Sequence, residues 1–259
     1  MTGAHPAVTA VAAPELAPGL RDLGLLRRGE ALDVHDAWHM DMDCRCVVKT
    51  LRPDRGDDVA AADALRIEAA RLMAFAHPHL VRAFDLVEAG RPMLVLETLD
   101  GMTLDGLIED EDGLHPDDMR ELGSQLASGL SYLHRRGVLH LDLKPSNIVC
   151  TAGAARLIDL SIARAPGPGR AGVGTDGYMA PEQESGAEVT AATDVFGLAG
   201  VLLEASTTEP PPPAGTAVAW PRRRRPPADV REVLGACRAP SPHARPGLDE
   251  LASVLRGAG

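Results

Sequence analysis

The chain has 259 residues, of which 45% are hydrophobic and 24% charged, an ordinary balance for a globular protein. Its net charge is −11, which argues against a general affinity for nucleic acid or anionic membranes. The four cysteines show neither a disulfide framework nor paired zinc-ligand spacing. We therefore expect structural thiols in a reducing compartment, with a metal site at Cys44 and Cys46 as the less favoured alternative.

The first twenty residues, MTGAHPAVTAVAAPELAPGL, lack both the basic start and the continuous apolar stretch of a signal peptide. We interpret residues 1–20 as a flexible tail. No window approaches the ~18 apolar residues that a membrane span requires. We therefore expect a cytoplasmic protein.

The first third after the tail reads mainly as strands. Short strand-like runs occupy about 21–51, ending in the β-branched, alternating segment RCVVKTL. Asp57 and Asp58 then favour the start of a helix that runs to about Phe75. Two more strands are predicted near 80–88 and 92–98.

The remaining two thirds read mostly as helices. Residues 116–137 have Pro116 at the start and leucines at helical spacing, and an apolar helix over about 196–205 is expected to be fully buried. The Pro-rich stretch 209–227 is predicted to be a loop, and 228–238 and 248–256 to be helices. This order predicts an α+β fold with a small β-rich lobe (about 21–97) and a larger helical lobe (about 99–257).

Chemistry-bearing residues gather around a predicted hairpin formed by 148–151 and 155–161. If its turn centres on Gly153, facing residues sum to about 306, and Asn147 lies opposite Asp159 with Asp142 nearby. Hard oxygen ligands beside a positioned carboxylate suit chemistry on Mg²⁺-bound phosphates.

Several motifs, in order along nearly the whole chain, resemble those of Ser/Thr protein kinases of the eukaryotic-like, bacterial type. HLDLKPSN is similar to the catalytic loop, IDLS to the DFG segment and GTDGYMAPEQ to the end of the activation segment. TDVFGLAGVLLE resembles helix F, and Arg245 matches the arginine that pairs with the Glu of the APE motif. The resemblance implies a bilobal kinase fold and transfer of the γ-phosphoryl group of Mg²⁺-ATP to hydroxyls of protein substrates.

The resemblance also implies roles for single residues. Asp142 would orient the substrate hydroxyl and accept its proton, and Lys144 would steady the transferring phosphoryl group. Asn147 and Asp159 would hold Mg²⁺. Thr175 matches the threonine that contacts the catalytic Asp and Lys.

The ATP site is implied in the same way. Lys49 would contact the α- and β-phosphates and pair with Glu68. The other residues expected at the nucleotide are Gly29, Val34, Val47, Glu97 and Leu99. His140 is interpreted as a packed structural histidine.

The chain departs from the family pattern at three places. Arg27 and Leu32 stand at two of the three expected glycines of the phosphate-binding loop, where a side chain hinders close approach of the backbone. The DFG segment reads Asp159-Leu160-Ser161. Leu141 replaces the arginine that often receives an activation-loop phosphate, and residues 165–174 contain no hydroxyl. We therefore predict competence without activation-loop phosphorylation.

Two alternatives remain open at this stage. The altered glycine loop fits a pseudokinase, a binding module with weak or no nucleotide turnover. A small-molecule kinase is disfavoured, because such enzymes usually lack Lys144 and the closing Ala180-Pro181-Glu182. Arg222–Arg225 would contact an acidic partner or an anionic surface, although such a charge run is more often a solvated loop.

Overall fold

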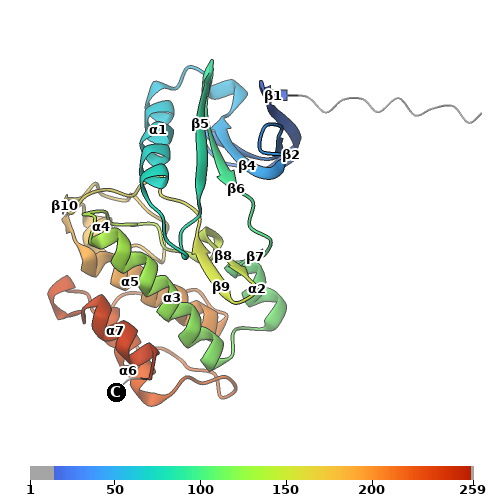
Figure 1. Ribbon diagram of the computed structural model, residues 1–259. Helices are drawn as coiled ribbons and strands as arrows, with labels where there is room; N and C mark the ends of the chain where they lie inside the picture. Colours follow the sequence, from blue (N-terminus) through green and yellow to red (C-terminus); the bar gives the residue numbers. More distant parts are fainter. Residues whose placement is uncertain (1–14, 258–259) are drawn as a thin grey trace, which may run out of the picture. The chain divides into compact units, whose positions relative to one another are not determined.

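A computed structural model describes residues 15–257 of the chain (Figure 1). The described chain forms two compact units: one extends to Ala69 and includes Ala83–Thr98, and the other comprises Ala70–Arg82 and everything from Leu99. The first unit is β-rich and the second mostly helical. The predicted α+β class is confirmed, although the segment 70–82 groups with the helical unit.

The β-rich unit is a six-stranded antiparallel sheet with the order β1-β2-β3-β4-β6-β5. One face of its inner strands carries small and β-branched residues, such as Ala37, Cys46, Val48 and Val95, which pack together as the core of this unit. Successive side chains of a strand point to opposite faces, so Lys49 lies on the other face. The strands are β1 (Glu15–Ala17), β2 (Leu20–Arg28), β3 (Leu32–His39), β4 (Cys44–Leu51), β5 (Ala83–Ala89) and β6 (Arg91–Glu97).

The start of the fold lies earlier than predicted. Glu15–Ala17 forms β1, which pairs with β2, so 15–20 belongs to the sheet and not to a tail. Residues 1–14, the rest of the predicted tail, lie outside the described residues. Leu20 and Ala17 are buried in the sheet core, which explains why this short hairpin is ordered.

Helix α1 (Val59–Ala74) begins directly after Asp57 and Asp58, as predicted. The Asp58 carboxylate accepts a hydrogen bond from the Ala61 N–H at 3.0 Å, which satisfies one of the free donors of the first turn.

The helical unit is built around α3 (Pro116–His134) and α5 (Ala191–Thr207), which lie side by side (Figure 1). Almost every side chain of α5 is buried, as predicted, and the helix starts five residues earlier than expected because Thr190 caps it. The loop 209–227 contains no helix or strand. The other helices are α2 (Leu104–Glu111), α4 (Pro181–Ser185), α6 (Ala228–Cys237) and α7 (Leu248–Leu255).

Two small sheets complete this unit. The strands β7 (Met102–Thr103), β8 (Ile148–Thr151) and β9 (Ala154–Leu157) form one, and β10 (Gly167–Pro168) pairs with β11 (Glu188–Val189) in the other. Within the described residues, no helix combines the length and apolarity that crossing a bilayer requires.

Candidate active site

In the β-rich unit, β4 and α1 bring Lys49 and Glu68 together. The Lys49 Nζ atom lies 2.7 and 2.9 Å from the two carboxylate oxygens of Glu68, and the two side chains are only 8% and 1% exposed. Burial of an isolated charge is costly, so each of these groups stabilises the other in its ionised form. The pair fixes an ammonium group at one defined point of the sheet.

Two apolar side chains lie on the same face of the sheet as the Lys49 ammonium group. Val34 is the cross-strand partner of Lys49, and Val47 lies two residues before it on β4, so all three share one face of the sheet. Glu97 is the last residue of β6 and pairs with Cys46, and Leu99 follows it at the start of the helical unit. Val34, Val47 and Lys49 thus share one face of the sheet, whereas Glu97, paired with Cys46, lies at the end of β6 on the other face.

The β2–β3 turn, expected to be the phosphate-binding loop, is held by backbone and side-chain hydrogen bonds. The Gly29 N–H donates to the Leu32 carbonyl at 2.8 Å, and Arg28 forms two 3.1 Å bonds with the buried Asp33. Arg52 donates to the carbonyl of Gly29 at 3.2 Å. A tight, hydrogen-bonded turn thus stands where the family pattern has a flexible glycine-rich loop. Arg28 and Asp33, to which the sequence motifs gave no role, form the ion pair that holds it.

In the helical unit, a buried carboxylate on α5 holds the catalytic-loop segment. Asp194 accepts the backbone N–H groups of His140 and Leu141, each at 2.8 Å, and lies 2.7 Å from His134 Nε2. Leu141 has φ 67°, a left-handed conformation that costs roughly 1–2 kcal/mol for a residue with a Cβ. The Asp194 carboxylate offsets that strain and fixes the direction of the next residue, Asp142.

Three side chains then fix the Asp142 carboxylate. Thr175 Oγ1 donates to Oδ1 at 2.6 Å, and Lys144 Nζ lies 2.9 Å from Oδ2. Lys144 also donates to Thr175 Oγ1 at 2.8 Å, so the three groups close a triangle. Asn147 Nδ2 donates to Asp142 Oδ2 at 2.9 Å and to its backbone carbonyl at 3.0 Å. The arrangement presents a partly exposed carboxylate beside an ammonium group, which suits proton acceptance next to a negatively charged reactant.

Asp159 follows the β8–β9 hairpin. Facing residues sum to 305 and not 306, because Ile148 pairs with Leu157 around the Gly153 turn. Asn147 therefore lies opposite Ile158, whose N–H donates to the Asn147 carbonyl at 3.1 Å, and Asp159 lies one residue beyond. The predicted register was off by one residue. The Asp159 carboxylate accepts the Ser161 N–H at 2.8 Å.

His140 is completely buried, as a structural histidine should be. Burial lowers its pKa, against the opposing effect of Asp194, and its Nδ1 accepts the Asp142 N–H at 3.3 Å. The ring therefore supports the backbone of Asp142 as a neutral imidazole.

The activation segment is tied to the catalytic loop by backbone and amide contacts. Leu139 and Arg164 exchange two backbone hydrogen bonds of 2.7 and 3.0 Å. The buried Gln183 donates from Nε2 to the carbonyls of Leu141, at 2.9 Å, and of Val173, at 3.2 Å. One neutral side chain thus joins the segment to the backbone of Leu141.

Two buried arginines lie behind this segment, both packed on the Phe196 ring. Arg245 forms two bonds, of 2.6 and 2.8 Å, with Glu182, and although burial alone would raise the pKa of Glu182, these bonds hold it below its usual value. Arg238 instead donates to the carbonyls of Gly177 and Pro212. Burial, and then the charge of Arg245, lowers the pKa of Arg238 to about 10.

Comparison with known proteins agrees with this geometry. The family model for the protein kinase domain matches residues 21–253. The chain belongs to the protein kinase family. It is 32% identical over 92% of its length to a probable serine/threonine-protein kinase of Streptomyces coelicolor, and 33% identical over 72% to the serine/threonine-protein kinase PknB of Mycobacterium tuberculosis.

The kinase-family relatives are longer proteins. The chain covers 37% of the Streptomyces coelicolor relative, 32% of PknB and 42% of PkaA, a serine/threonine-protein kinase of Streptomyces coelicolor to which it is 34% identical. It thus spans about a third of the length of these relatives.

Three residues around this site have contacts that the sequence motifs do not predict. Asp194 and Gln183 lie within motifs that resemble those of the family. Both accept from or donate to backbone atoms, and a sequence motif does not show such contacts. Glu204 is a third case. It accepts a short hydrogen bond from the Tyr178 hydroxyl, and burial, assisted by Asp105, raises its pKa to about 7. A glutamate ten residues after Asp194 on a buried helix was the available signal.

Proposed function

We propose that this chain is an active Ser/Thr protein kinase that transfers the γ-phosphoryl group of Mg²⁺-ATP to protein hydroxyls. The observation that carries the proposal is the closed arrangement of Asp142, Lys144 and Thr175, with Asn147 completing the contacts of the carboxylate. Since phosphoryl transfer needs little covalent assistance, positioned charges supply most of the acceleration.

Each side chain has a defined task in this proposal. Asp142 accepts the proton of the substrate hydroxyl, and Lys144 stabilises the negative charge that develops on the transferring group. In the β-rich unit, Lys49 binds the α- and β-phosphates while Glu68 holds it in place.

The donor set fits a magnesium ion. The Asn147 amide uses its nitrogen for both contacts with Asp142, which leaves its oxygen to act as a ligand beside the Asp159 carboxylate. Hard oxygen donors of this kind are those that Mg²⁺ prefers. When bound, Mg²⁺ would neutralise phosphate charge during transfer.

The same proposal includes competence without activation-loop phosphorylation. Gln183 and the Leu139–Arg164 bridge fix the segment through neutral hydrogen bonds, a task that a phosphate and an arginine perform where both are present. Residues 165–174 have no hydroxyl to modify. Phosphatase treatment of the purified chain should therefore leave its activity unchanged.

A pseudokinase is the second candidate, and the pinned β2–β3 turn with Leu32 at a glycine position favours it. Such a binding module would keep the fold while turning over little nucleotide. Phosphate incorporation and thermal stabilisation by Mg²⁺-ATP separate the two functions.

Phosphate incorporation from Mg²⁺-ATP is measured by intact mass on the chain and a generic protein substrate, beside Asp142→Ala. Incorporation on Ser or Thr by the parent and at least ~10²-fold less by the variant is the expected result. No incorporation by either, together with no gain in thermal stability from Mg²⁺-ATP, would replace the kinase proposal with the pseudokinase.

A further inference from the structure

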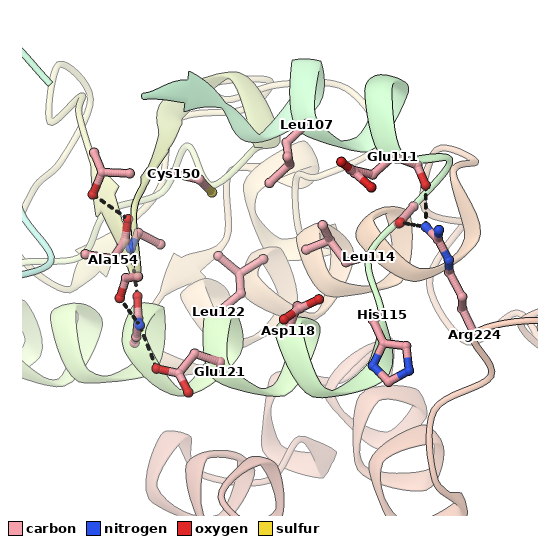
Figure 2. Close-up of a pocket in the computed structure, with 15 residues that line it drawn as sticks. Leu107, Glu111, Leu114, His115, Asp118, Glu121, Leu122, Cys150, Ala154 and Arg224 are labelled. Atoms are coloured by element: carbon pink, nitrogen blue, oxygen red, sulfur yellow. Dashed lines mark hydrogen bonds between the residues drawn. The ribbon is translucent and has the colours of Figure 1, made fainter. Parts of the chain in front are cut away.

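Three arginines hold the proline-rich loop 209–227 against the helices of its unit. Arg224 lies in the loop itself, lines a cavity beside α2 and donates to backbone carbonyls at the C-terminal end of that helix (Figure 2). From α6, Arg231 donates from Nε to the Pro226 carbonyl at 3.1 Å. Arg238, directly after the last residue of α6, is the third. The loop has no helix or strand, so these side chains do much to fix its path.

Arg238 differs from the other two arginines in what else it reaches. Its Nη2 donates to the Pro212 carbonyl of the loop at 2.6 Å and also to the Gly177 carbonyl of the activation segment at 3.4 Å. Its own carbonyl accepts the Gly215 N–H at 2.9 Å. One residue at the end of α6 therefore joins the loop to the activation segment, two stretches that are far apart in the sequence.

The guanidinium of Arg238 is buried without a carboxylate partner. The residue is 4% exposed, and within the described part of the chain its Nε and Nη1 atoms have no hydrogen-bond acceptor. The buried carboxylate nearby, that of Glu182, is bound by Arg245. Burial of an unpaired charge destabilises a fold, and an apolar side chain of similar size usually serves stability as well or better. What this arginine contributes is therefore not stability.

Helix α5 has a fitted place for this guanidinium. Its central carbon lies 3.7 Å from the centroid of the Phe196 ring, and a Cβ at Gly200 would lie only 3.1 Å from Nη1. Pro211 and Tyr178 close on the same point of α5. A planar guanidinium can stack on an aromatic ring and still donate at its edge, so Nη2 is held where it reaches both carbonyls.

Gly177 belongs to a turn that is tied to the proposed catalytic carboxylate. The turn begins at Thr175, whose hydroxyl donates to Asp142 at 2.6 Å. The Thr175 carbonyl accepts the N–H groups of Tyr178, at 3.1 Å, and of Met179, at 3.0 Å. Thr175 is partly exposed and Gly177 is exposed. A polypeptide that brings a hydroxyl to Asp142 therefore passes along this turn.

We propose that Arg238 is a positioning residue for the protein substrate. It holds the turn 175–178 against α5 and the loop 209–227, so that a polypeptide meets a surface of fixed geometry beside Asp142. The identity of that polypeptide as a substrate rests on the proposed kinase function, whereas the fixing of the turn needs no phosphoryl transfer.

Arg238→Met removes the buried charge and both donated bonds while it keeps a long side chain. Its KM for a generic protein substrate should rise about tenfold, whereas kcat should stay within about threefold and the KM for ATP within about twofold of the parent. Lys144 and Asn147 still hold Asp142, so proton transfer is preserved. The melting temperature should equal or exceed that of the parent, because the unpaired charge is gone.

Arg231→Met is the matched control for these measurements. It also removes an arginine of α6 that donates to the loop 209–227, but this arginine bonds to Pro226. Both of its KM values should stay within about twofold of the parent. An equal rise in the substrate KM of the two variants would overturn the proposal, because the loop alone would then be responsible. An unchanged substrate KM in Arg238→Met would overturn it as well.

Arg238→Lys separates the donated bonds from the packing. A lysine ammonium can donate to both carbonyls, but it remains a buried cation and lacks the plane that stacks on Phe196. The substrate KM should lie between those of the parent and Arg238→Met, and the melting temperature below both. A substrate KM no lower than that of Arg238→Met would overturn the proposal, since the hydrogen bonds would then not position the turn.

Hydrogen exchange, followed by mass spectrometry on peptides covering 175–180, tests the turn without any turnover. The amides of Tyr178 and Met179 should exchange several-fold faster in Arg238→Met and at the parent rate in Arg231→Met. Unchanged exchange in Arg238→Met would refute the positioning role whatever the kinase assay shows. Faster exchange, together with no phosphate incorporation by the parent, would remove the kinase function and keep the role of Arg238 in fixing the turn.

Discussion

In the β-rich unit, the proposed phosphate contact depends on one buried ion pair, Lys49–Glu68, beside a turn that has lost two glycines. In the helical unit, three side chains hold Asp142, and Asp194 holds the loop that precedes it. Several side chains therefore fix the position of the proposed catalytic carboxylate, whereas a single ion pair fixes the proposed phosphate contact. We therefore expect nucleotide binding, not proton transfer, to be the weaker step of the proposed reaction.

Removing the Asp194 anchor of the helical unit should have the largest effect. Asp194→Asn leaves one buried oxygen for two backbone donors, so the free energy of unfolding should fall by about 3 kcal/mol. Thermal melting should show a decrease of roughly 6–12 °C. Phosphoryl transfer below that temperature should fall at least ~10-fold, since Asp142 loses its direction.

Asp43→Asn is the control for this variant. Asp43 is exposed in a turn with φ 50°, which Asn adopts readily, so its melting temperature should change by less than about 1 °C. A melting temperature of Asp194→Asn that also stays within 1 °C would show that other contacts hold the loop.

A glycine at position 32 of the β-rich unit should strengthen nucleotide binding. Leu32→Gly should lower the KM for ATP about tenfold, because the backbone can then approach the phosphates more closely. It should also lower the free energy of unfolding by roughly 0.5–1 kcal/mol, since glycine loses more conformational entropy on folding.

Steady-state kinetics at varied ATP and thermal melting measure these two effects. Leu23→Gly, at an exposed position of β2 away from the turn, should reduce stability and leave the KM unchanged. If the KM is insensitive to Leu32→Gly as well, the turn does not limit nucleotide binding and the contrast between the two units fails.

The smallest expected effect concerns Glu204, which receives the Tyr178 hydroxyl of the activation segment. Burial raises its pKa to about 7, above the unfolded value near 4.5, so the folded state binds the extra proton more tightly. The resulting stabilisation is complete below pH 4.5 and is lost as the pH rises through 7. The group is partly exposed, so we expect about 1 kcal/mol after solvent screening.

Glu204→Gln should abolish this pH dependence. The variant should melt a few degrees above the parent at pH 8 and near it at pH 5, whereas Glu209→Gln, at an exposed position, should follow the parent. Parallel pH profiles of parent and Glu204→Gln would mean that Tyr178 stabilises the charged carboxylate fully.

Hydrophobic periodicity and end signals in the sequence were sufficient to predict most of the elements. The leucines of 116–137 and the apolar run of about 196–205 predicted α3 and the buried α5, because burial on one face or on all sides dictates residue spacing. The kinase motifs supplied the candidate residues, since phosphoryl transfer needs particular charged groups. Helix α3 nevertheless ends at His134, three residues before the predicted end at 137. The spacing of apolar residues does not show where the backbone hydrogen bonds of a helix stop.

Contacts that are made through backbone atoms, or between residues far apart in the sequence, depend on the folded arrangement of the chain. The sequence motifs identified Asp142, Lys144, Asn147 and Thr175 as candidate site residues, because the motifs occur in the order typical of the family. The fold decided that Asp194 holds the Leu141 N–H, that Gln183 joins two carbonyls, and that Arg224 closes a cavity beside α2. Every residue has the same backbone donor and acceptor, so residue letters carry no record of which of them a distant side chain will reach.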